Sequence, residues 1–268
     1  MLKILIRGSG DIGSAVAWHL FQAGYSPVLH DEPHPSATRR KMAFSDAIFD
    51  GRAELEGLSA QRLDDMQKLE PLLATRTCVP VLTCDFISLL QSYQPQVLID
   101  ARMRKHVQPE NQLQLAALTI GLGPNFNAGE NVQIAIETGR GENLGQVIRQ
   151  GSTQALQGEP IELGGHARER YLYAPASGLF QSDCQIGENV TQGQIIAHLN
   201  GSPLPAPLTG VLRGLTRSGI QVSARTKIIE IDPRGPAAQI SGIAMRPARI
   251  AQGVLNAIAT STNIPQKP

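Results

Sequence analysis

The sequence is poor in aromatic residues and in net charge, and both shortages exclude classes of function. Phenylalanine, tyrosine and tryptophan make up 4% of the 268 residues, too few for a surface that stacks nucleic-acid bases. The formal net charge of +1 provides no overall attraction to nucleic acids or to anionic membranes. We therefore expect neither a nucleic-acid partner nor a membrane partner.

Long hydrophobic runs are also missing. No stretch approaches the ~18 consecutive apolar residues that mark a membrane span. The first apolar run, Leu2 to Ile6, is too short for a secretory signal and leads directly into a glycine turn. These absences favour a cytoplasmic protein.

Cysteine is scarce, and its spacing fits neither a disulfide framework nor a CxxC motif. The three cysteines are Cys78, Cys84 and Cys184. Cys78 and Cys84 are each expected to serve as a small buried apolar residue. A cysteine that carries sulfur or selenium would need exposure and a lowered pKa, and the sequence reveals neither. His30 and His34 are four residues apart, but Pro33 between them argues against the helical spacing of paired metal ligands. The sequence therefore predicts no metal site.

A glycine-rich turn follows the first apolar run. The turn spans residues 8–13, a helical pattern follows it, and a second apolar run over residues 27–30 ends at Asp31. This order of strand, turn, helix and strand is how a βαβ unit builds a site for the phosphates and ribose of a dinucleotide. The residues expected to contact such a ligand here are Gly8, Ser9, Gly10, Asp11, Ile12, Gly13 and Asp31.

Each part of the turn has an expected role. Gly8 would allow the tight turn, Gly10 would let the backbone approach a pyrophosphate, and Gly13 would let the helix pack on the strand. The free amide groups at the start of the helix would face the phosphates, and Asp31 would accept hydrogen bonds from the ribose. The alternative is a βαβ unit whose glycines serve packing alone, since a fold does not fix a function.

The first half of the chain continues to alternate between helix and strand signals. Short apolar runs over residues 79–82, 97–102 and 118–124 predict buried strands, and Asp85 is expected to begin a helix that Pro95 closes. Ligands of open α/β sheets bind beyond the carboxyl ends of strands, which makes Asp100, Gly121 and Gly123 further candidate ligand-binding residues. Asp100 could orient a ribose or an amine, or could simply cap nearby amide groups at the end of its strand.

Three arginines are candidates for pairing with a phosphate. Arg39 and Arg40 follow the second strand by a few residues, and Arg140 lies between two glycines. A guanidinium group suits a phosphate or diphosphate. The alternative for Arg39 and Arg40 is a solvated helix face, and the alternative for Arg140 is an ordinary turn.

The second half changes character, because strand-like runs alternate with turns and helix signals fade until residues 249–258. Residues 172–199 match residues 204–231 without a gap, at a constant offset of 32. Such a repeat predicts two like β units packed about a pseudo-twofold axis, each too small to bury a core alone.

The repeat resembles the biotinyl/lipoyl-type barrel-sandwich family in its Ala-Pro-x-x-Gly and Gly-x-x-Val-x-x-Gly elements. Carrier domains of that family present a modified lysine on the hairpin between the halves. The corresponding stretch here, residues 198–205, contains no lysine, so we expect a structural or docking module.

The expected fold class is therefore α/β, with a Rossmann-like parallel-sheet domain followed by a mainly β domain that contains a barrel-sandwich-hybrid-like repeat. The first domain is expected over residues 1–125 and the second over residues 126–258, with a boundary that could lie as late as residue 170. Residues 259–268 are expected to form a loose tail.

Further phrases in the chain resemble the selenium-dependent molybdenum hydroxylase accessory family. Together with the glycine turn they span residues 1–258 in the expected order, and they are Ala43–Gly51, Ile120–Gly129, Glu137–Gly145, Gly158–Gly165 and Ile231–Gly235. The resemblance implies a maturation or system protein for molybdenum hydroxylases of the xanthine-dehydrogenase type that carry a labile selenium. Its partners would be the hydroxylase apoenzyme or other maturation proteins, and it could form a homo-oligomer.

The chain departs from this family in two places. Asn125 stands where the family tends to have glycine, and Gly139–Glu142 stands where the family has Asn-Arg-Gly-His. The second departure removes a histidine and leaves Arg140 as the candidate in that loop.

Three hypotheses for function remain open on the sequence. The first is an accessory protein that binds a nucleotide or the dinucleotide form of the molybdenum cofactor. The second is an NAD(P)-dependent oxidoreductase, although no Tyr-x-x-x-Lys pair is present because Val97 follows Tyr93 by four residues. The third is a scaffold whose glycine turn holds nothing. No catalytic residue can be assigned from spacing, and whether the protein is an enzyme is left open.

Overall fold

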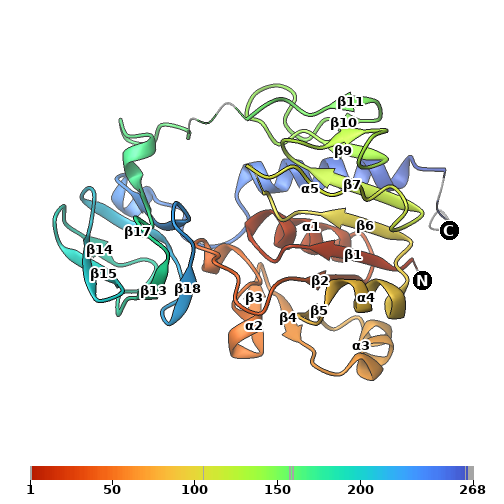
Figure 1. Cartoon of the computed structure of the whole chain (residues 1–268), viewed down its shortest axis with the longest axis horizontal. Coiled ribbons are helices and arrows are strands. Elements are labelled where there is room, and N and C mark those ends of the chain that lie inside the picture. The colour runs from red at the N-terminus through yellow and green to blue at the C-terminus, as the bar shows by residue number, and fades with distance from the viewer. Residues whose placement is uncertain (1, 105, 157, 159, 263, 265–268) are drawn as a thin grey trace. The chain divides into compact units, whose positions relative to one another are not determined.

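The computed structural model describes residues 2–104, 106–156, 158, 160–262 and 264, and the chain divides into two compact units (Figure 1). The first, which we call the α/β unit, comprises residues 1–33, 43–157 and 243–268. The second, which we call the β unit, comprises residues 34–42 and 158–242. The expected boundary at residue 125 falls inside the α/β unit, and the chain passes to the β unit at residue 158, before the later limit of 170.

The α/β unit is built on a nine-stranded sheet with the order β10-β9-β7-β6-β1-β2-β5-β4-β3. The strands from β4 to β9 in this order pair in parallel, and β3 and β10 are antiparallel at the two edges. Their bounds are β1 (Ile4–Arg7), β2 (Pro27–His30), β3 (Arg52–Leu55), β4 (Leu58–Arg62), β5 (Val79–Leu82), β6 (Val97–Asp100), β7 (Leu118–Leu122), β9 (Ile134–Ile136) and β10 (Val147–Ile148). A separate two-stranded sheet pairs β8 (Asn127–Ala128) with β11 (Gly151–Ser152).

Helices cover both faces of this sheet because its central strands are apolar on both sides. Ile4 and Ile6 of β1 pack in one core with residues of α1 and α5, while Leu5 between them packs in another core with residues of α3 and α4. The helices are α1 (Asp11–Gln22), α2 (Ala47–Asp50), α3 (Leu69–Thr75), α4 (Phe86–Tyr93) and α5 (Met245–Ala259), with a 3₁₀ turn η2 (Met66–Lys68).

The expected helix after Asp85 is confirmed as α4. The Asp85 carboxylate accepts a hydrogen bond of 2.9 Å from the amide of Ser88, which caps the first turn. Gln94 then adopts a left-handed conformation, with φ of 50°, immediately before Pro95. The helix therefore ends where its sequence requires.

Two elements that were expected in the mainly β domain belong instead to the α/β unit. The run Val132–Ile136 supplies β9, which extends the large sheet beside β7, and the C-terminal helical pattern forms α5, which packs against α1. A strand or helix signal predicts the element but not the sheet that it joins. Of the expected tail, residues 263 and 265–268 lie outside the described residues, while Ser261 and Ile264 are buried.

The direction in which the chain moves across the sheet changes at β1. The chain runs from β1 to β2 and β5 on one side, and then crosses to β6, β7 and β9 on the other. The carboxyl ends of these parallel strands all lie on the same side of the sheet. There the glycine turn after β1 meets the segment after β6.

The β unit contains two four-stranded sheets, with the orders β12-β19-β17-β14 and β16-β15-β13-β18. An offset of 32 residues places β12, β19, β17 and β14 in register with β16, β15, β13 and β18, so the two sheets correspond strand for strand. The bounds are β12 (Tyr171–Tyr173), β13 (Gly178–Gln181), β14 (Asn189–Val190), β15 (Ile195–Leu199), β16 (Ser202–Pro205), β17 (Gly210–Leu215), β18 (Ile220–Val222) and β19 (Lys227–Asp232), with 3₁₀ turns η1 (Arg40–Met42), η3 (Arg168–Arg170) and η4 (Gly235–Ala237).

A segment from the N-terminal half of the chain is built into the β unit. The carbonyl of Thr38 accepts a hydrogen bond of 2.8 Å from the amide of Leu215, and Arg40 Nε donates to the carbonyl of Leu215 at 2.9 Å. Lys41 Nζ donates to the carbonyl of Ile186 at 2.7 Å. Residues 34–42 therefore act as part of this unit although they follow β2 directly.

The packing of α5 gives a test of the α/β unit. Gly253 lies in the middle of α5, and a Cβ at this position would overlap the carbonyl oxygen of Gly145. Helix propensity alone would favour Gly253→Ala by about 1 kcal/mol. We expect the overlap to prevail, so that the variant loses about 1–3 kcal/mol in the free energy of unfolding. Urea denaturation would measure this, with Gln252→Ala on the exposed side of α5 as the control, and a Gly253→Ala variant as stable as the wild type would contradict the packing.

Candidate functional site

Two glycines of the turn after β1 are explained by the packing of the protein itself. Gly8 has a φ of 104°, its amide donates to the carbonyl of His30 at 2.7 Å, and a Cβ there would lie 2.9 Å from the carbonyl oxygen of Ala101. A Cβ on Gly13 would overlap the carbonyl oxygen of Gly8. Only glycine allows these backbones to approach each other, so the two residues fix the start of α1 against the ends of β1 and β6.

Gly10 is different, because neither conformation nor contacts of the protein require a glycine. Its φ of −67° and ψ of −176° are open to any residue, and a Cβ there would meet nothing within 4 Å. Among the described residues no hydrogen bond engages the amide of Gly10, which is the N-cap of α1 and has no capping side chain. Asp11 already uses its carboxylate on this first turn, where Oδ1 accepts from the amide of Ile12 at 3.1 Å.

Asp31 lies at the end of β2 and holds the glycine turn. Its Oδ2 accepts hydrogen bonds of 2.6 Å from both the amide and the hydroxyl of Ser9, and its Oδ1 accepts from the amide of Glu32 at 2.8 Å. Ser14 Oγ donates to the carbonyl of Ser9 at 2.8 Å and accepts from the amide of Phe44. The expected ribose acceptor is therefore half-buried and orders the backbone of the turn.

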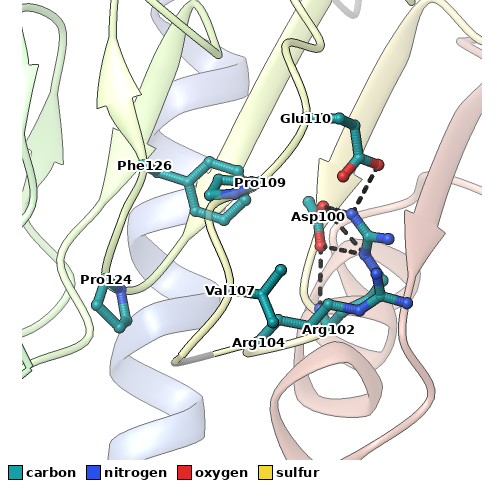
Figure 2. Close-up of a pocket in the computed structure, with 8 residues that line it drawn as sticks. All are labelled: Asp100, Arg102, Arg104, Val107, Pro109, Glu110, Pro124 and Phe126. Carbon is teal, nitrogen blue, oxygen red and sulfur yellow. Dashed lines mark hydrogen bonds and ion pairs between the residues drawn. The ribbon is translucent and has the colours of Figure 1, made fainter.

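A cluster of charges lies at the ends of β1 and β6, and we call it the arginine cluster. Asp100 is buried at the last position of β6 and accepts from Arg102 Nε at 3.0 and 3.1 Å and from Gln112 Nε2 at 2.7 Å. Figure 2 shows Asp100, Arg102 and Glu110 facing one another, and Arg102 donates to Glu110 at 2.9 Å. Arg7, the last residue of β1, also donates to Glu110 and lies 3.8 Å from Asp100.

Burial and pairing shift the pKa values in this cluster in opposite directions. Burial, followed by repulsion from Arg102, lowers the pKa of Arg7, whose guanidinium lies 3.6 Å from the ring of Phe86. Burial also acts to lower the pKa of Arg102, but its hydrogen bonds and attraction to Asp100 and Glu110 raise it overall. Partial burial would raise the pKa of Glu110, yet the hydrogen bond from Arg7 and the nearby positive charges lower it to about 2. Glu110 is therefore ionised throughout the physiological range of pH.

A small pocket of about 20 Å³ lies beside the arginine cluster. It is lined by Asp100, Arg102, Arg104, Val107, Pro109, Glu110, Pro124 and Phe126 (Figure 2). A space of this size holds about one water molecule. A phosphate group would therefore fit only if a lining side chain moved.

The remaining glycine candidates pack against protein groups at the same edge of the sheet. A Cβ on Gly121, in β7, would overlap the ring of Phe126. Gly123 has a φ of 103°, and a Cβ there would lie 3.1 Å from Thr138 Oγ1. Close packing at the end of β7 therefore accounts for glycine at both positions.

The arginine candidates are distributed between the two units. Arg140 is exposed in the loop after β9, where the buried carboxylate of Glu137 accepts from the amide of Gly139 at 2.5 Å and from the amide of Gln154 at 2.7 Å. Arg39 belongs to the β unit, where its guanidinium makes hydrogen bonds of 2.9 and 3.1 Å to Glu230. Arg39 and Arg40 thus fasten residues 34–42 within the β unit, a use that the sequence did not reveal.

The arginine cluster is the part of the site that sequence reasoning missed. Arg7, Arg102, Glu110 and Gln112 were not among the candidates. Arg7 did leave a signal, because a charged residue ends an otherwise apolar strand just before Gly8. Glu110 and Gln112 left none, since they lie in an irregular stretch between β6 and β7.

The cysteines and histidines give no sign of redox or metal chemistry in the described part of the chain. Cys78 is buried as expected, but the expectation for Cys84 is wrong, because its residue is exposed after the end of β5. Partial burial of the sulfur atoms raises the pKa of all three thiols, which opposes formation of a reactive thiolate. No group of three or more His, Cys, Asp or Glu side chains that could hold a metal ion is found among the described residues. Within the same residues, no helix is long and apolar enough to cross a membrane.

Comparison with known proteins gives one clear sequence relative. The chain is 37% identical over 255 residues to the uncharacterized protein YqeB of Escherichia coli K12, and the match covers 95% of the chain. It covers 47% of YqeB, so the chain spans about half the length of this relative. No model of a protein family matches the chain.

Similarity to solved structures is slight. An aspartoacylase family protein of Mesorhizobium loti is 10% identical with a TM-score of 0.25, over 86% of this chain and 85% of the other. The succinylglutamate desuccinylase/aspartoacylase of Rhodobacter sphaeroides is 17% identical with a TM-score of 0.22, over 54% and 61%. The ectoine utilization protein EutE of Ruegeria pomeroyi is 15% identical with a TM-score of 0.22, over 31% and 27%. Scores this low carry no argument about fold or function.

The burial of Asp100 predicts a large difference between two acid–arginine pairs. Asp100→Ala would leave Arg102 and Arg7 with one carboxylate fewer in a buried site, which we expect to cost about 3–5 kcal/mol in the free energy of unfolding. Asp64 pairs with Arg62 at 2.7 Å, but its side chain is 71% exposed. Asp64→Ala should therefore cost less than about 1 kcal/mol. If urea denaturation showed similar losses in the free energy of unfolding for the two variants, it would contradict the conclusion that the buried arginine cluster stabilises the protein.

His30 predicts a dependence of stability on pH. Burial, and then repulsion from the arginines, lowers its pKa below the ordinary value of 6.5, while its Nε2 lies 2.8 Å from the carbonyl oxygen of Cys84. The unfolded chain therefore takes up a proton on His30 before the folded protein does. Its contribution to stability is complete above about pH 6.5 and is lost as the pH falls below that value.

The His30→Gln variant separates this effect from other titrating groups. The difference in Tm between wild type and variant should shrink as the pH is lowered from 7.5 to 5. A difference that stays constant over this range would show that His30 does not titrate differently in the two states.

Proposed function

We propose that the α/β unit binds a nucleotide-bearing ligand at the glycine turn. We further propose that the chain acts as an accessory protein of a selenium-dependent molybdenum hydroxylase system in the cytoplasm. The ligand would be the dinucleotide form of the molybdenum cofactor or another nucleotide. Its protein partners would be the hydroxylase apoenzyme or other maturation proteins.

The observation that supports ligand binding most directly is the open space at Gly10. The packing of the protein accounts for Gly8 and Gly13, but a Cβ at Gly10 would meet no atom within 4 Å. A glycine that the fold does not need is explained if the backbone there must approach a ligand closely. The position at the start of the twelve-residue helix α1 suits a phosphate, because amide groups and the helix dipole favour an anion there.

The order of the parallel strands supports the same location. Within the parallel part of the sheet, the order β9-β7-β6-β1-β2-β5 reverses between β1 and β6, which supports the expected Rossmann-like arrangement, although β4 adds a further parallel strand beside β5. Open α/β sheets bind their ligands beyond the carboxyl ends of the strands at such a reversal. Gly8, Asp31 and Asp100 all follow or end strands at this edge.

The residues present fit the nucleotide portion of a cofactor. Gly10 would leave room for a diphosphate, and Asp31 at the end of β2 is placed to accept a hydrogen bond from a ribose. The molybdenum cofactor would bring its own redox chemistry, and this chain would hold and orient its nucleotide. The proposal of a molybdenum hydroxylase partner rests on the sequence phrases that resemble the accessory family.

The β unit suits a docking or stiffening role rather than a carrier role. Its two matched sheets support the likeness to a barrel-sandwich, and the turn between β15 and β16 consists of Asn200 and Gly201. The Asn200 side chain accepts from the amide of Leu179 at 2.8 Å, so it serves the fold. No lysine stands at this turn to receive biotin or a lipoyl group.

Titration of the purified protein tests the proposal. Calorimetry with the molybdenum cofactor dinucleotide and with NAD should show binding of at least one of them, and the Gly10→Val variant should bind about tenfold more weakly or worse, a loss of about 1.4 kcal/mol. Because a Cβ there would meet no atom within 4 Å, the variant should lose only the roughly 1 kcal/mol that valine costs at an N-cap, and its Tm should fall by a few degrees at most. Binding of NAD but not of the cofactor would favour the oxidoreductase alternative, and absence of any binding would favour a scaffold.

A further inference from the structure

We propose that Arg7 and Arg102 form the binding site for a phosphate group of the ligand, and that Glu110 occupies this site until the ligand displaces it. This inference rests on the proposed function, because it names the groups that would recognise the nucleotide. In this proposal the Glu110 carboxylate competes with the phosphate of the ligand for the two arginines.

The two carboxylates of the arginine cluster differ in how firmly they are held. Asp100 ends β6, its side chain is 3% exposed, and Gln112 Nε2 donates to it in addition to Arg102. The Glu110 side chain is 46% exposed and lies in the irregular stretch between β6 and β7. Asp100 is therefore built into the sheet, whereas Glu110 can leave by a rearrangement of surface chain.

Arg7 cannot leave with Glu110. It belongs to β1, which pairs with β2 on one side and β6 on the other, and its guanidinium stacks on Phe86. Its Nε is buried without a hydrogen-bond partner among the described residues. If Glu110 moved away, Asp100 alone would face Arg7 and Arg102 in a site with little water. Such a charge imbalance must be met by another anion.

The backbones that carry the two arginines meet the glycine turn. Arg7 immediately precedes Gly8, and a Cβ on Gly8 would lie 3.0 Å from the amide nitrogen of Arg102. We therefore assign the phosphate of a ligand bound at the turn to these two guanidinium groups, since guanidinium groups bind phosphate oxygens through paired N–H donors. The neighbouring pocket of about 20 Å³ is too small for a phosphate beside Glu110, so the two anions would exclude each other.

The Glu110→Gln variant tests this competition. Replacing the carboxylate by an amide keeps the size of the side chain and weakens its hold on the two arginines. If Glu110 blocks the site most of the time, the apparent affinity of the wild type is reduced in proportion to the small fraction of molecules whose site is open. Glu110→Gln should increase that fraction, and we expect NAD or ADP to bind to it roughly tenfold more tightly. Glu130→Gln is the matched control, since it removes the same charge from an exposed position of the same unit and should leave affinity unchanged.

Inorganic phosphate separates failure of this inference from failure of the proposed function. Calorimetry should detect phosphate binding to Glu110→Gln and weaker or no binding to the wild type and to Glu130→Gln. This result would support the site even if no nucleotide bound. Equal nucleotide affinity of wild type and Glu110→Gln would overturn the competition and leave the proposed function standing. Failure of Glu110→Gln to bind either phosphate or nucleotide would overturn the anion site itself.

Discussion

The edge of the large sheet depends on the approach of three backbones at glycines. Gly13 at the start of α1 lies against the carbonyl of Gly8, and Gly8 lies against the carbonyl of Ala101 after β6. These contacts leave no room for a Cβ, so they bring a helix N-terminus and two strand ends closer together than side chains would permit. Three charged groups of the candidate site are attached to this junction, because Arg7 precedes it, Arg102 follows Ala101 and Asp31 bonds to Ser9 within it.

Buried arginines serve different purposes in the two units. In the β unit, Glu230 is fully buried, and four cationic side chains surround it. These are Arg39, Arg170, Arg213 and Lys227. Burial would raise the pKa of Glu230, but the charges of Lys227 and Arg39 hold it well below its usual value. There the carboxylate is fixed in β19 and the cations fasten surrounding segments to it. In the arginine cluster Arg7 is fixed in β1 and one carboxylate, that of Glu110, lies on irregular chain, which is why we propose that this carboxylate gives way to another anion.

Several elements could be predicted because their signals are local. The strands β1, β2, β5, β6 and β7 and the helix α4 lie where short apolar runs and an Asp cap indicated them. The repeat at an offset of 32 residues anticipated two corresponding sheets, because an ungapped repeat preserves the length and order of strands. The partners of β9, α5 and residues 34–42 could not be predicted, since each has an ordinary local pattern and its partners lie far away in the chain.

The amino-acid sequence by itself determined the glycine turn, the acid at the end of β2, the strand that ends in Asp100 and the absence of a carrier lysine. These features depend on the identity of a residue and on its immediate neighbours. Only the tertiary structure decided that Gly10 alone of the three turn glycines borders open space, that Arg39 pairs with Glu230, and that Glu110 lies between Arg7 and Arg102. The physical reason is that open space and charge pairing are properties of surroundings, which the folded chain assembles from residues more than a hundred positions apart, as with Arg7 and Glu110.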